Sequence, residues 1–451
     1  MLSPCLRDVC CLFLLLVLAA APVAAQEAPP ADTLSLQEVV RLALERNVEA
    51  QIARNDVEIA ANDYSIGNAG FLPSLTLDAG YNGTTSNTRQ QFIDRDPQEI
   101  SGARSTRRSA GAELRWRLFD GLGRFAAYNR LEAELGQERA DAEQVVEAVL
   151  ADVVVTYYEV ARQQRQLAVL REAVDISRER VRIAELRRDL GSASDLEVRQ
   201  AQVDLNADRA AVLRQEETLA NTKSALNRLL ARRDASTAFG VVDRIDVDRT
   251  LEREALLAEA EARNPVLERA RRARRAAEWE QREIRAERWP ALDATLGYGY
   301  ARNESESGFL QSSRAYDLTY GLTLSFDLFN GFDRRRRLQN AAVRTRTAGL
   351  LIEDVRTQLT TDLTSAYTSY RNRLELVALE RENLEAAAAN VDLALERFRL
   401  GEITSVELRE VQEQRIQAES RLLAARFEAK QAEVTLLQLS GQLLERMQGG
   451  E

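Results

Sequence analysis

Short motifs in the first half of the chain recur in the second half, in the same order. Arg-Leu-Phe-Asp-Gly at 117–121 returns as Asp-Leu-Phe-Asn-Gly at 327–331, an offset of 210 residues. The same offset relates 187–191 to 397–401. Motifs that keep their order and spacing over such distances indicate an internal duplication.

Earlier in each half the offset is 217 residues, as between Asn47 and Asn264. The change of seven residues falls before the Leu-Phe motif, so one loop there is longer in the first half. We therefore divide the mature chain into two structural repeats, 26–250 and 251–451.

Each repeat predicts the same series of elements. A helix that ends before a proline comes first, at 34–69 and 251–288. Two strands follow, at 72–82 and 109–120 in the first repeat and at 290–301 and 315–329 in the second. A long helix (122–190 and 332–400), a glycine turn and a returning helix (195–231 and 405–444) complete each unit. Residues 232–249 form a linker.

The first 25 residues have the character of a secretory signal peptide, because a short apolar run at 12–18 is followed by small residues. An uncleaved membrane helix is the alternative, but the run is short for a bilayer span. All three cysteines (Cys5, Cys10 and Cys11) lie in this segment. After it, no apolar run is long enough for a membrane helix.

The mature chain lacks the usual residues of catalysis and metal binding. It has no cysteine, and the whole sequence has no histidine. There is no glycine-rich phosphate loop and no nucleophile beside a base. We therefore expect neither an enzyme nor a cofactor or metal. The net charge of −10 argues against a nucleic-acid partner.

The four strand segments alternate apolar and polar residues, as in Leu318, Tyr320, Leu322 and Leu324. Each is roughly 10 residues long, the length that a tilted strand needs to cross a bilayer. A soluble half-buried sheet would show the same alternation. Four strands cannot enclose a pore, because even a small filled barrel needs about 8. If they span a membrane, three chains would supply 12 strands.

The long helices carry apolar residues at seven-residue spacing, as at Val160, Leu167, Val174 and Val181. This spacing predicts left-handed coiled-coil packing. A helix of about 69 residues is about 100 Å long, and the two shorter helices of each repeat, stacked end to end, reach a similar length. The other faces are rich in Arg, Glu and Gln and are predicted to be solvated.

The layout resembles the TolC-like outer-membrane efflux protein family over nearly all of the mature chain. The resemblance is carried by the segments 36–47, 70–73, 118–121, 187–198 and 397–408. It implies a mostly α-helical protein with membrane β-strands. A homotrimer would form a 12-stranded β-barrel continued by a 12-helix coiled-coil tunnel in the periplasm. The family's function is passive export through the outer membrane, in efflux pumps or type I secretion.

The resemblance also implies partners and site residues. A periplasmic adaptor and an inner-membrane pump would dock at the two glycine turns. The residues that match the family's adaptor-contacting motif are Arg187, Leu190, Gly191, Arg397, Leu400 and Gly401. The alternative is that these are only helix-stop signals, since backbone geometry alone explains a glycine there.

Family members close the tunnel with acidic rings near these turns. The matching positions hold Glu197, Glu407 and Glu410, where the family often has aspartate. The alternative is that they are ordinary surface glutamates. A different class of function, a periplasmic coiled-coil adaptor or structural protein, is disfavoured because no lipoyl-like domain interrupts 122–231. The sequence carries no signal for the transported substrate.

Overall fold

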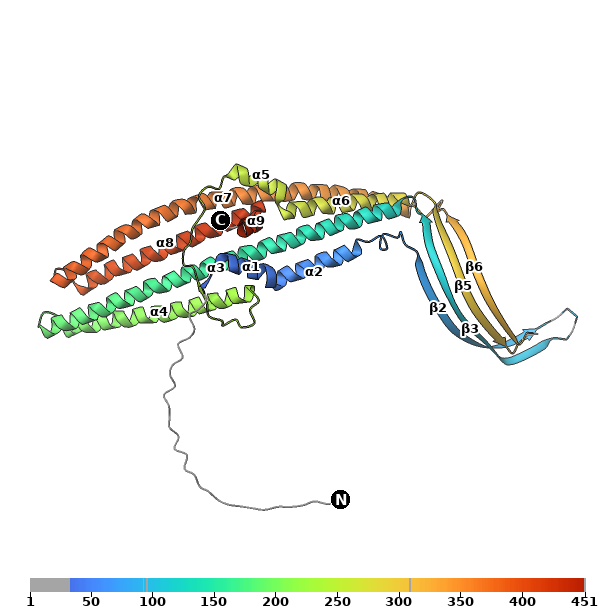
Figure 1. The fold of residues 1–451 in the computed structure, drawn as a ribbon, viewed down its shortest axis with the longest axis horizontal. Coiled ribbons are helices and arrows are strands. Elements are labelled where there is room, and N and C mark those ends of the chain that lie inside the picture. Colours follow the sequence, from blue (N-terminus) through green and yellow to red (C-terminus); the bar gives the residue numbers. More distant parts are fainter. Residues whose placement is uncertain (1–32, 92, 95, 308–309, 450–451) are drawn as a thin grey trace, which may run out of the picture.

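The computed structural model describes residues 33–91, 93–94, 96–307 and 310–449, so the predicted signal peptide lies outside the described residues. A bent four-stranded sheet stands at one end, and a long helical body extends from it (Figure 1). Within the described ranges, no helix combines the length and the apolar character needed to cross a bilayer.

Two helices run the full length of the body, from the sheet to the far end (Figure 1). They are α3 (Gly123–Asp189, 67 residues) and α7 (Asp333–Leu400, 68 residues). At 1.5 Å per residue each is about 100 Å long. Each turns back into a shorter helix, α4 (Asp195–Leu229) after α3 and α8 (Ser405–Ser440) after α7. We call α3/α4 the first hairpin, α7/α8 the second, and their turns, 190–194 and 401–404, the tip.

The helix that opens each repeat is broken near its middle, which differs from the single helices expected at 34–69 and 251–288. The first repeat has α1 (Leu36–Arg46) and α2 (Val48–Asp63), and the second has α5 (Arg253–Arg263) and α6 (Pro265–Ala286). The breaks fall at Asn47 and Asn264, which cap the helices that follow. In the second repeat Pro265 marks the break, because proline is favoured in a first helical turn.

Asn47 also ties the break to the rest of the body. Its Oδ1 accepts hydrogen bonds from the backbone N–H groups of Glu49 (2.9 Å) and Ala50 (3.1 Å). Its Nδ2 donates to the carbonyl oxygen of Leu229, at the end of α4 (2.9 Å). Asn264 repeats this arrangement with Leu267 and Leu439. The asparagine pair that marked the duplication therefore fixes the bend in both repeats.

Replacing Asn47 with alanine should lower the free energy of unfolding by about 2–4 kcal/mol. The variant loses a helix cap, at about 1 kcal/mol, and leaves a partly buried carbonyl without its donor, at about 1–3 kcal/mol. Thermal unfolding of the purified protein measures the change. Asn206→Ala, which removes only an exposed contact to Gln202, should cost far less. Equal effects of the two substitutions would contradict the proposed role of Asn47.

The sheet consists of β2 (Ser74–Gln90), β3 (Gln98–Phe119), β5 (Ala291–Ser305) and β6 (Ser312–Ser325). All neighbours are antiparallel, in the order β2-β3-β5-β6. Strands β3 and β5 come from different repeats, so their pairing joins the two halves. The outer edges of β2 and β6 have no partner strand within the described chain.

The strands differ in length from the predicted segments 72–82, 109–120, 290–301 and 315–329. The largest difference is in the pair of strands β2 and β3, which are 17 and 22 residues long. Much of 82–108, the segment between the two predicted strands, is therefore paired strand. Backbone hydrogen bonds continue the ladder there, although most side chains are polar on both faces. Apolar alternation identified only the portion of the hairpin with an apolar face.

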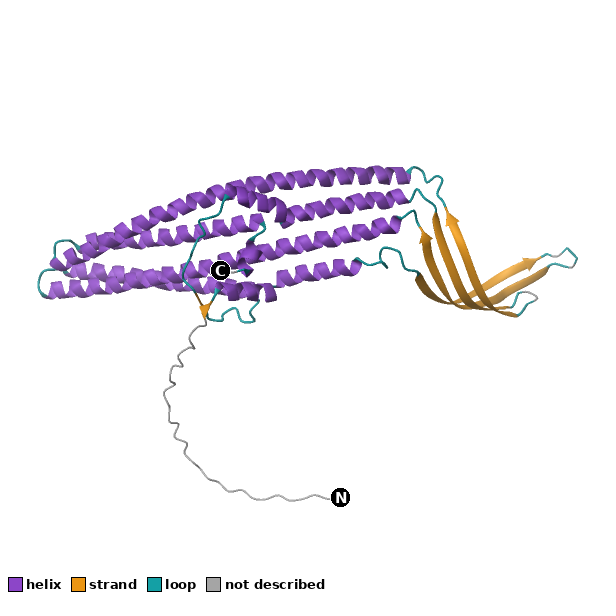
Figure 2. Cartoon of the chain, turned by 45° about the horizontal axis from the view of Figure 1, so that its top comes forward, coloured by secondary structure: helices purple, strands orange, loops and turns teal. Residues whose placement is uncertain are grey.

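One face of the sheet carries a continuous apolar band. Leu75 pairs with Leu114, Leu114 with Leu296, and Leu296 with Tyr320. Leu75 and Tyr320 are 67% and 78% exposed. Because the sheet stands apart from the helical body (Figure 2), the band is not part of the protein's own core.

The main core lies midway along the helices. There a two-stranded parallel sheet, β1 (Thr33–Leu34) with β4 (Gly240–Val241), packs on α3 together with α9 (Leu443–Gln448). Tyr157 of α3 is buried and donates a hydrogen bond to the carbonyl of Leu34 at 3.2 Å. This core fixes the linker and the C-terminal segment against the long helices, and the tip projects beyond it.

Candidate functional site

The tip is built from two helix ends of the same type. Gly191 and Gly401 have φ values of 75° and 81°, a conformation that strongly favours glycine. The N–H groups of Ser192 and Glu402 donate to the carbonyls of Arg187 (2.8 Å) and Arg397 (2.9 Å). Helix termination therefore explains why glycine stands at both turns and why the carbonyls of both arginines accept these hydrogen bonds. It does not account for the side chains around them.

Four apolar side chains project from the tip. Leu190 and Leu400, which match across the repeats, are each 75% exposed. Leu196 and Val406, each the second residue of its returning helix, are 75% and 68% exposed and also match at an offset of 210. Sequence reasoning missed this second pair, although the duplication contained the signal. Together the four form an apolar surface at the end of a highly charged body.

The two tip arginines have different environments. The Arg187 guanidinium lies 5.6 Å from the centre of the Phe398 ring and 3.8 Å from Glu197. Phe398 is fully buried in a small cluster shared by both hairpins. Arg187 thus connects the first hairpin to the second, whereas the side chain of Arg397 is exposed.

The three predicted gate glutamates also differ. Oε2 of Glu407 accepts hydrogen bonds from the N–H (2.7 Å) and Oγ1 (2.9 Å) of Thr404, so this carboxylate caps α8. The backbone N–H of Thr404 holds the pKa of Glu407 below its usual value, and the threonine hydroxyl adds to the effect. Glu197 faces Arg187. Glu410 is exposed and has no hydrogen bond or ion pair with any residue that the structure describes.

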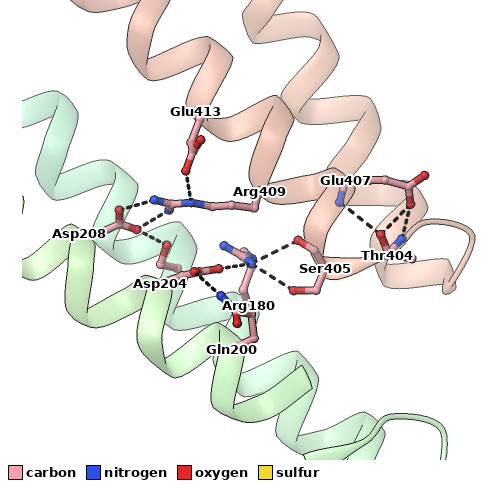
Figure 3. A network of polar contacts seen from close by, with 10 residues as sticks. Arg180, Gln200, Asp204, Asp208, Thr404, Ser405, Glu407, Arg409 and Glu413 are labelled. Carbon is pink, nitrogen blue, oxygen red and sulfur yellow. Dashed lines mark hydrogen bonds and ion pairs between the residues drawn. The ribbon is translucent and has the colours of Figure 1, made fainter. Parts of the chain in front are cut away.

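Above the tip, a polar network joins the hairpins (Figure 3). Arg180 of α3 is only 1% exposed. Its Nη2 donates to Asp204 of α4 at 2.9 Å and to the carbonyl and hydroxyl of Ser405 in α8 at 3.2 and 3.1 Å. Burial lowers the pKa of Arg180, and Asp204 opposes that effect. Arginine nevertheless keeps its charge, so these contacts offset only part of a large desolvation cost, because the buried Nε and Nη1 have no partner among the described residues.

A second link lies beside the first. Arg409 of α8 donates two hydrogen bonds to Asp208 of α4, from Nη1 to Oδ2 at 2.7 Å and from Nη2 to Oδ1 at 2.9 Å. Ser177 of α3 donates to the same Oδ2 at 2.5 Å. A bidentate arginine–carboxylate pair is strong and directional. The two links therefore hold the hairpins together just above the tip.

Sequence reasoning did not find these residues, although two of them interrupt the apolar pattern. Ser177 and Asp208 stand at coiled-coil positions where neighbouring turns place Val174, Val181 and Leu205. In the described part of the chain, no group of three or more histidine, cysteine, aspartate or glutamate residues could hold a metal ion. What this arrangement can do is control whether the hairpins separate.

Comparison with known proteins identifies the family. The family model described as outer membrane efflux protein matches residues 39–232 and 256–442, one segment in each repeat. Protein CyaE of Bordetella pertussis is 28% identical over 358 residues, which cover 78% of this chain and 73% of that protein. These matches confirm the TolC-like resemblance, and they decide against the alternative of a periplasmic adaptor or structural protein.

Solved structures confirm the fold class. The CmeC outer membrane channel of Campylobacter jejuni matches with a TM-score of 0.70 and 16% identity, over 90% of this chain and 85% of that one. VceC, an outer membrane protein of Vibrio cholerae, matches with a TM-score of 0.68 and 17% identity, over 90% and 96%. The apolar band of the sheet is then its lipid-facing surface, and the helical body lies in the periplasm. The chain belongs to the outer membrane efflux protein family and is an outer-membrane export channel.

Proposed function

We propose that three copies of this chain close one barrel and one helical tunnel, and that the tip is the gated periplasmic entrance. The free edges of the sheet support this assembly. A sheet edge exposed to lipid leaves backbone groups unsatisfied, at several kcal/mol each. Because each sheet has an even number of strands, β6 of one copy can pair antiparallel with β2 of the next. Three copies give 12 strands, enough for an open pore.

The helices support the same contact. Along the body, α2 packs on α3, α3 on α6, and α6 on α7. The outer members of this layer, α2 and α7, therefore follow the outer strands β2 and β6. Both helices carry a row of apolar residues that are each more than 50% exposed. They are Val48, Ile52 and Ile59 on α2, and Val343, Leu350 and Leu351 on α7. These rows complement each other between neighbouring copies.

The entrance would be recognised by a periplasmic adaptor that connects the channel to an inner-membrane pump. The apolar surface of Leu190, Leu196, Leu400 and Val406 supports a protein contact, because large apolar side chains are rarely exposed together without a partner. Arg187, Gly191, Arg397 and Gly401 shape the two turns that present it. We expect the transported molecules to be selected by the pump, since the polar faces of the long helices are rich in Arg, Glu and Gln and carry no signal for a substrate.

Among the candidate gate residues, the contacts favour Glu410. Its carboxylate is exposed and without a partner in the described chain, whereas Glu407 caps a helix and Glu197 faces Arg187. Threefold symmetry would turn Glu410 into a ring of three negative charges, which attracts cations. Glu407 and Glu197 would contribute less to the negative potential at the entrance, because Thr404 and Arg187 already balance part of their charge.

Glu410→Gln should raise the divalent-cation concentration that half-blocks conductance by about tenfold, because the ring loses three charges. Glu407→Gln should change it less, because hydrogen bonds from Thr404 already balance part of that charge. Planar-bilayer recordings with Mg²⁺ measure the block. The matched control is Glu217→Gln, an exposed glutamate of α4, which should leave the block unchanged.

The same preparation tests the assembly. Light scattering of the detergent extract should give the mass of three chains. A monomer that inserts no conductance would overturn the proposed assembly. Trimers whose divalent block is unaffected in Glu410→Gln would overturn only the role of Glu410.

A further inference from the structure

Far from the tip, the linker crosses the helical body and encloses a groove. Residues 243–249 pass over α3, α8 and α7 on their way to α5 (Figure 1). The groove beneath them has a volume of about 530 Å³. Its floor includes Leu374 and Val377 of α7 and Leu423 of α8. The channel function described above uses none of these residues.

The walls of the groove are strongly basic. Five arginines line it, from four different elements: Arg165, Arg244, Arg249, Arg381 and Arg426. Only two carboxylates, Asp243 and Asp246, line it with them. We call this the arginine groove. Its positive charge stands out in a chain whose net charge is −10.

Three of the five arginines have no balancing partner. Arg165 pairs with Glu419 at 3.4 Å, and Arg244 with Asp246 at 2.6 Å. In contrast, Arg249, Arg381 and Arg426 make no hydrogen bond or ion pair with any described residue. Most arginines elsewhere in the helical body have such a partner.

The gathering of these charges has an energetic cost. Burial lowers the pKa of Arg426, and the positive charges of Arg381 and Arg165 lower it further, while Asp246 opposes them. Arginine does not lose its proton at neutral pH, so the repulsion remains. An anion in the groove would relieve it.

We propose that the arginine groove binds a phosphate group, either as free phosphate or as a phosphate monoester on a larger molecule. Guanidinium groups form paired hydrogen bonds with phosphate oxygens. A phosphate monoester carries about −1.5 to −2 charges at pH 7 in a small volume, whereas a carboxylate brings one. That density matches three unpaired guanidiniums around one hollow. The site is independent of the gate.

The test compares the full-length detergent-solubilised protein with the variant Arg381→Gln/Arg426→Gln. Isothermal titration uses inorganic phosphate and, separately, glucose 6-phosphate, at constant ionic strength. The double variant should bind at least about tenfold more weakly, because two charge-assisted contacts are lost. Arg335→Gln/Arg346→Gln on α7 removes the same charge from exposed arginines outside the groove and should bind like the wild type.

Arg381→Lys guards against a simple folding defect, since it keeps the charge and loses the paired hydrogen bonds. It should bind with intermediate affinity. Equal binding of both ligands identifies the phosphate group itself as the ligand, and tighter binding of the sugar phosphate identifies a monoester. The proposal is overturned if the wild type shows no saturable binding, or if the control variant loses as much affinity for phosphate as Arg381→Gln/Arg426→Gln does. Saturation by a hexaglutamate peptide but not by phosphate would also overturn it, in favour of an acidic protein segment.

Discussion

Asp208→Ala should raise the resting conductance of the reconstituted channel. Asp208 receives the paired hydrogen bonds of Arg409 and one from Ser177, and the two side chains of the ion pair are only 10% and 19% exposed. Removing one partner of a buried ion pair costs about 3–5 kcal/mol. Even about 3 kcal/mol shifts an equilibrium by roughly a hundredfold. The hairpins of each copy should therefore separate far more often.

The matched control is Asp175→Ala. Asp175 is an exposed residue of the same helix α3 as Ser177, and its ion pair with Arg178 is 69% and 57% exposed. Exposed pairs contribute about 0–1 kcal/mol, so this variant should conduct like the wild type. Asp208→Asn should give an intermediate result, because the amide oxygen still accepts one hydrogen bond. If Asp208→Ala and Asp175→Ala conduct equally, the link does not restrain the tip.

Glu147→Gln should stabilise the protein above neutral pH. Glu147 of α3 is 3% exposed. Its Oε1 accepts a hydrogen bond from the N–H of Leu444 at 3.0 Å, but its buried Oε2 has no partner among the described residues. Burial raises the pKa of Glu147 to about 7 from a usual value of 4.5, although the N–H of Leu444 partly opposes this. A glutamine keeps the accepting oxygen and removes the charge.

The sign of the pH dependence follows from this shift. Between about pH 4.5 and 7 the folded state holds a proton that the unfolded state has released. Stability from this group is therefore present at low pH and is lost as pH rises through 7. The shift corresponds to about 3 kcal/mol. At pH 8, Glu147→Gln should unfold at a clearly higher temperature, with little difference at pH 4.

Thermal unfolding in detergent across this pH range measures the difference. Glu45→Gln is the control, because Glu45 is exposed and its carboxylate pairs, among the described residues, only with Arg41 of its own helix. An equal rise in unfolding temperature in both variants, or a rise for Glu147→Gln that is independent of pH, would rule out a raised pKa of Glu147 as the cause.

The general architecture could be predicted because it is written in periodic patterns. The heptads that begin at Val160 require long packed helices, and the duplication requires a second copy of each element. The strand ends could not be predicted, since pairing in β2 and β3 continues where the apolar alternation stops. The break at Asn47 was hidden for a similar reason. A capping asparagine inside a helical pattern looks like an ordinary polar residue until its partner, Leu229, is in place.

The site was predictable only in part. The glycine turns follow from local backbone geometry, which a sequence expresses directly. The link between Arg180 and Ser405 joins residues 225 positions apart, and nothing local indicates that pairing. Glu407 and Glu410 look alike in sequence, but Thr404 engages only the first. Long-range partners, more than residue type, separate the candidates.

The two tip turns arose by duplication, but the side chains around them now differ. Position 188 holds an arginine paired with Asp189, whereas its counterpart Phe398 is buried between the hairpins. In the proposed ring the entrance therefore has six hairpins of two alternating kinds, an approximate sixfold rim with exact threefold symmetry. A docking protein that binds as six copies must bind to two different kinds of site. One that binds as three can choose a single kind and leave the other free to move.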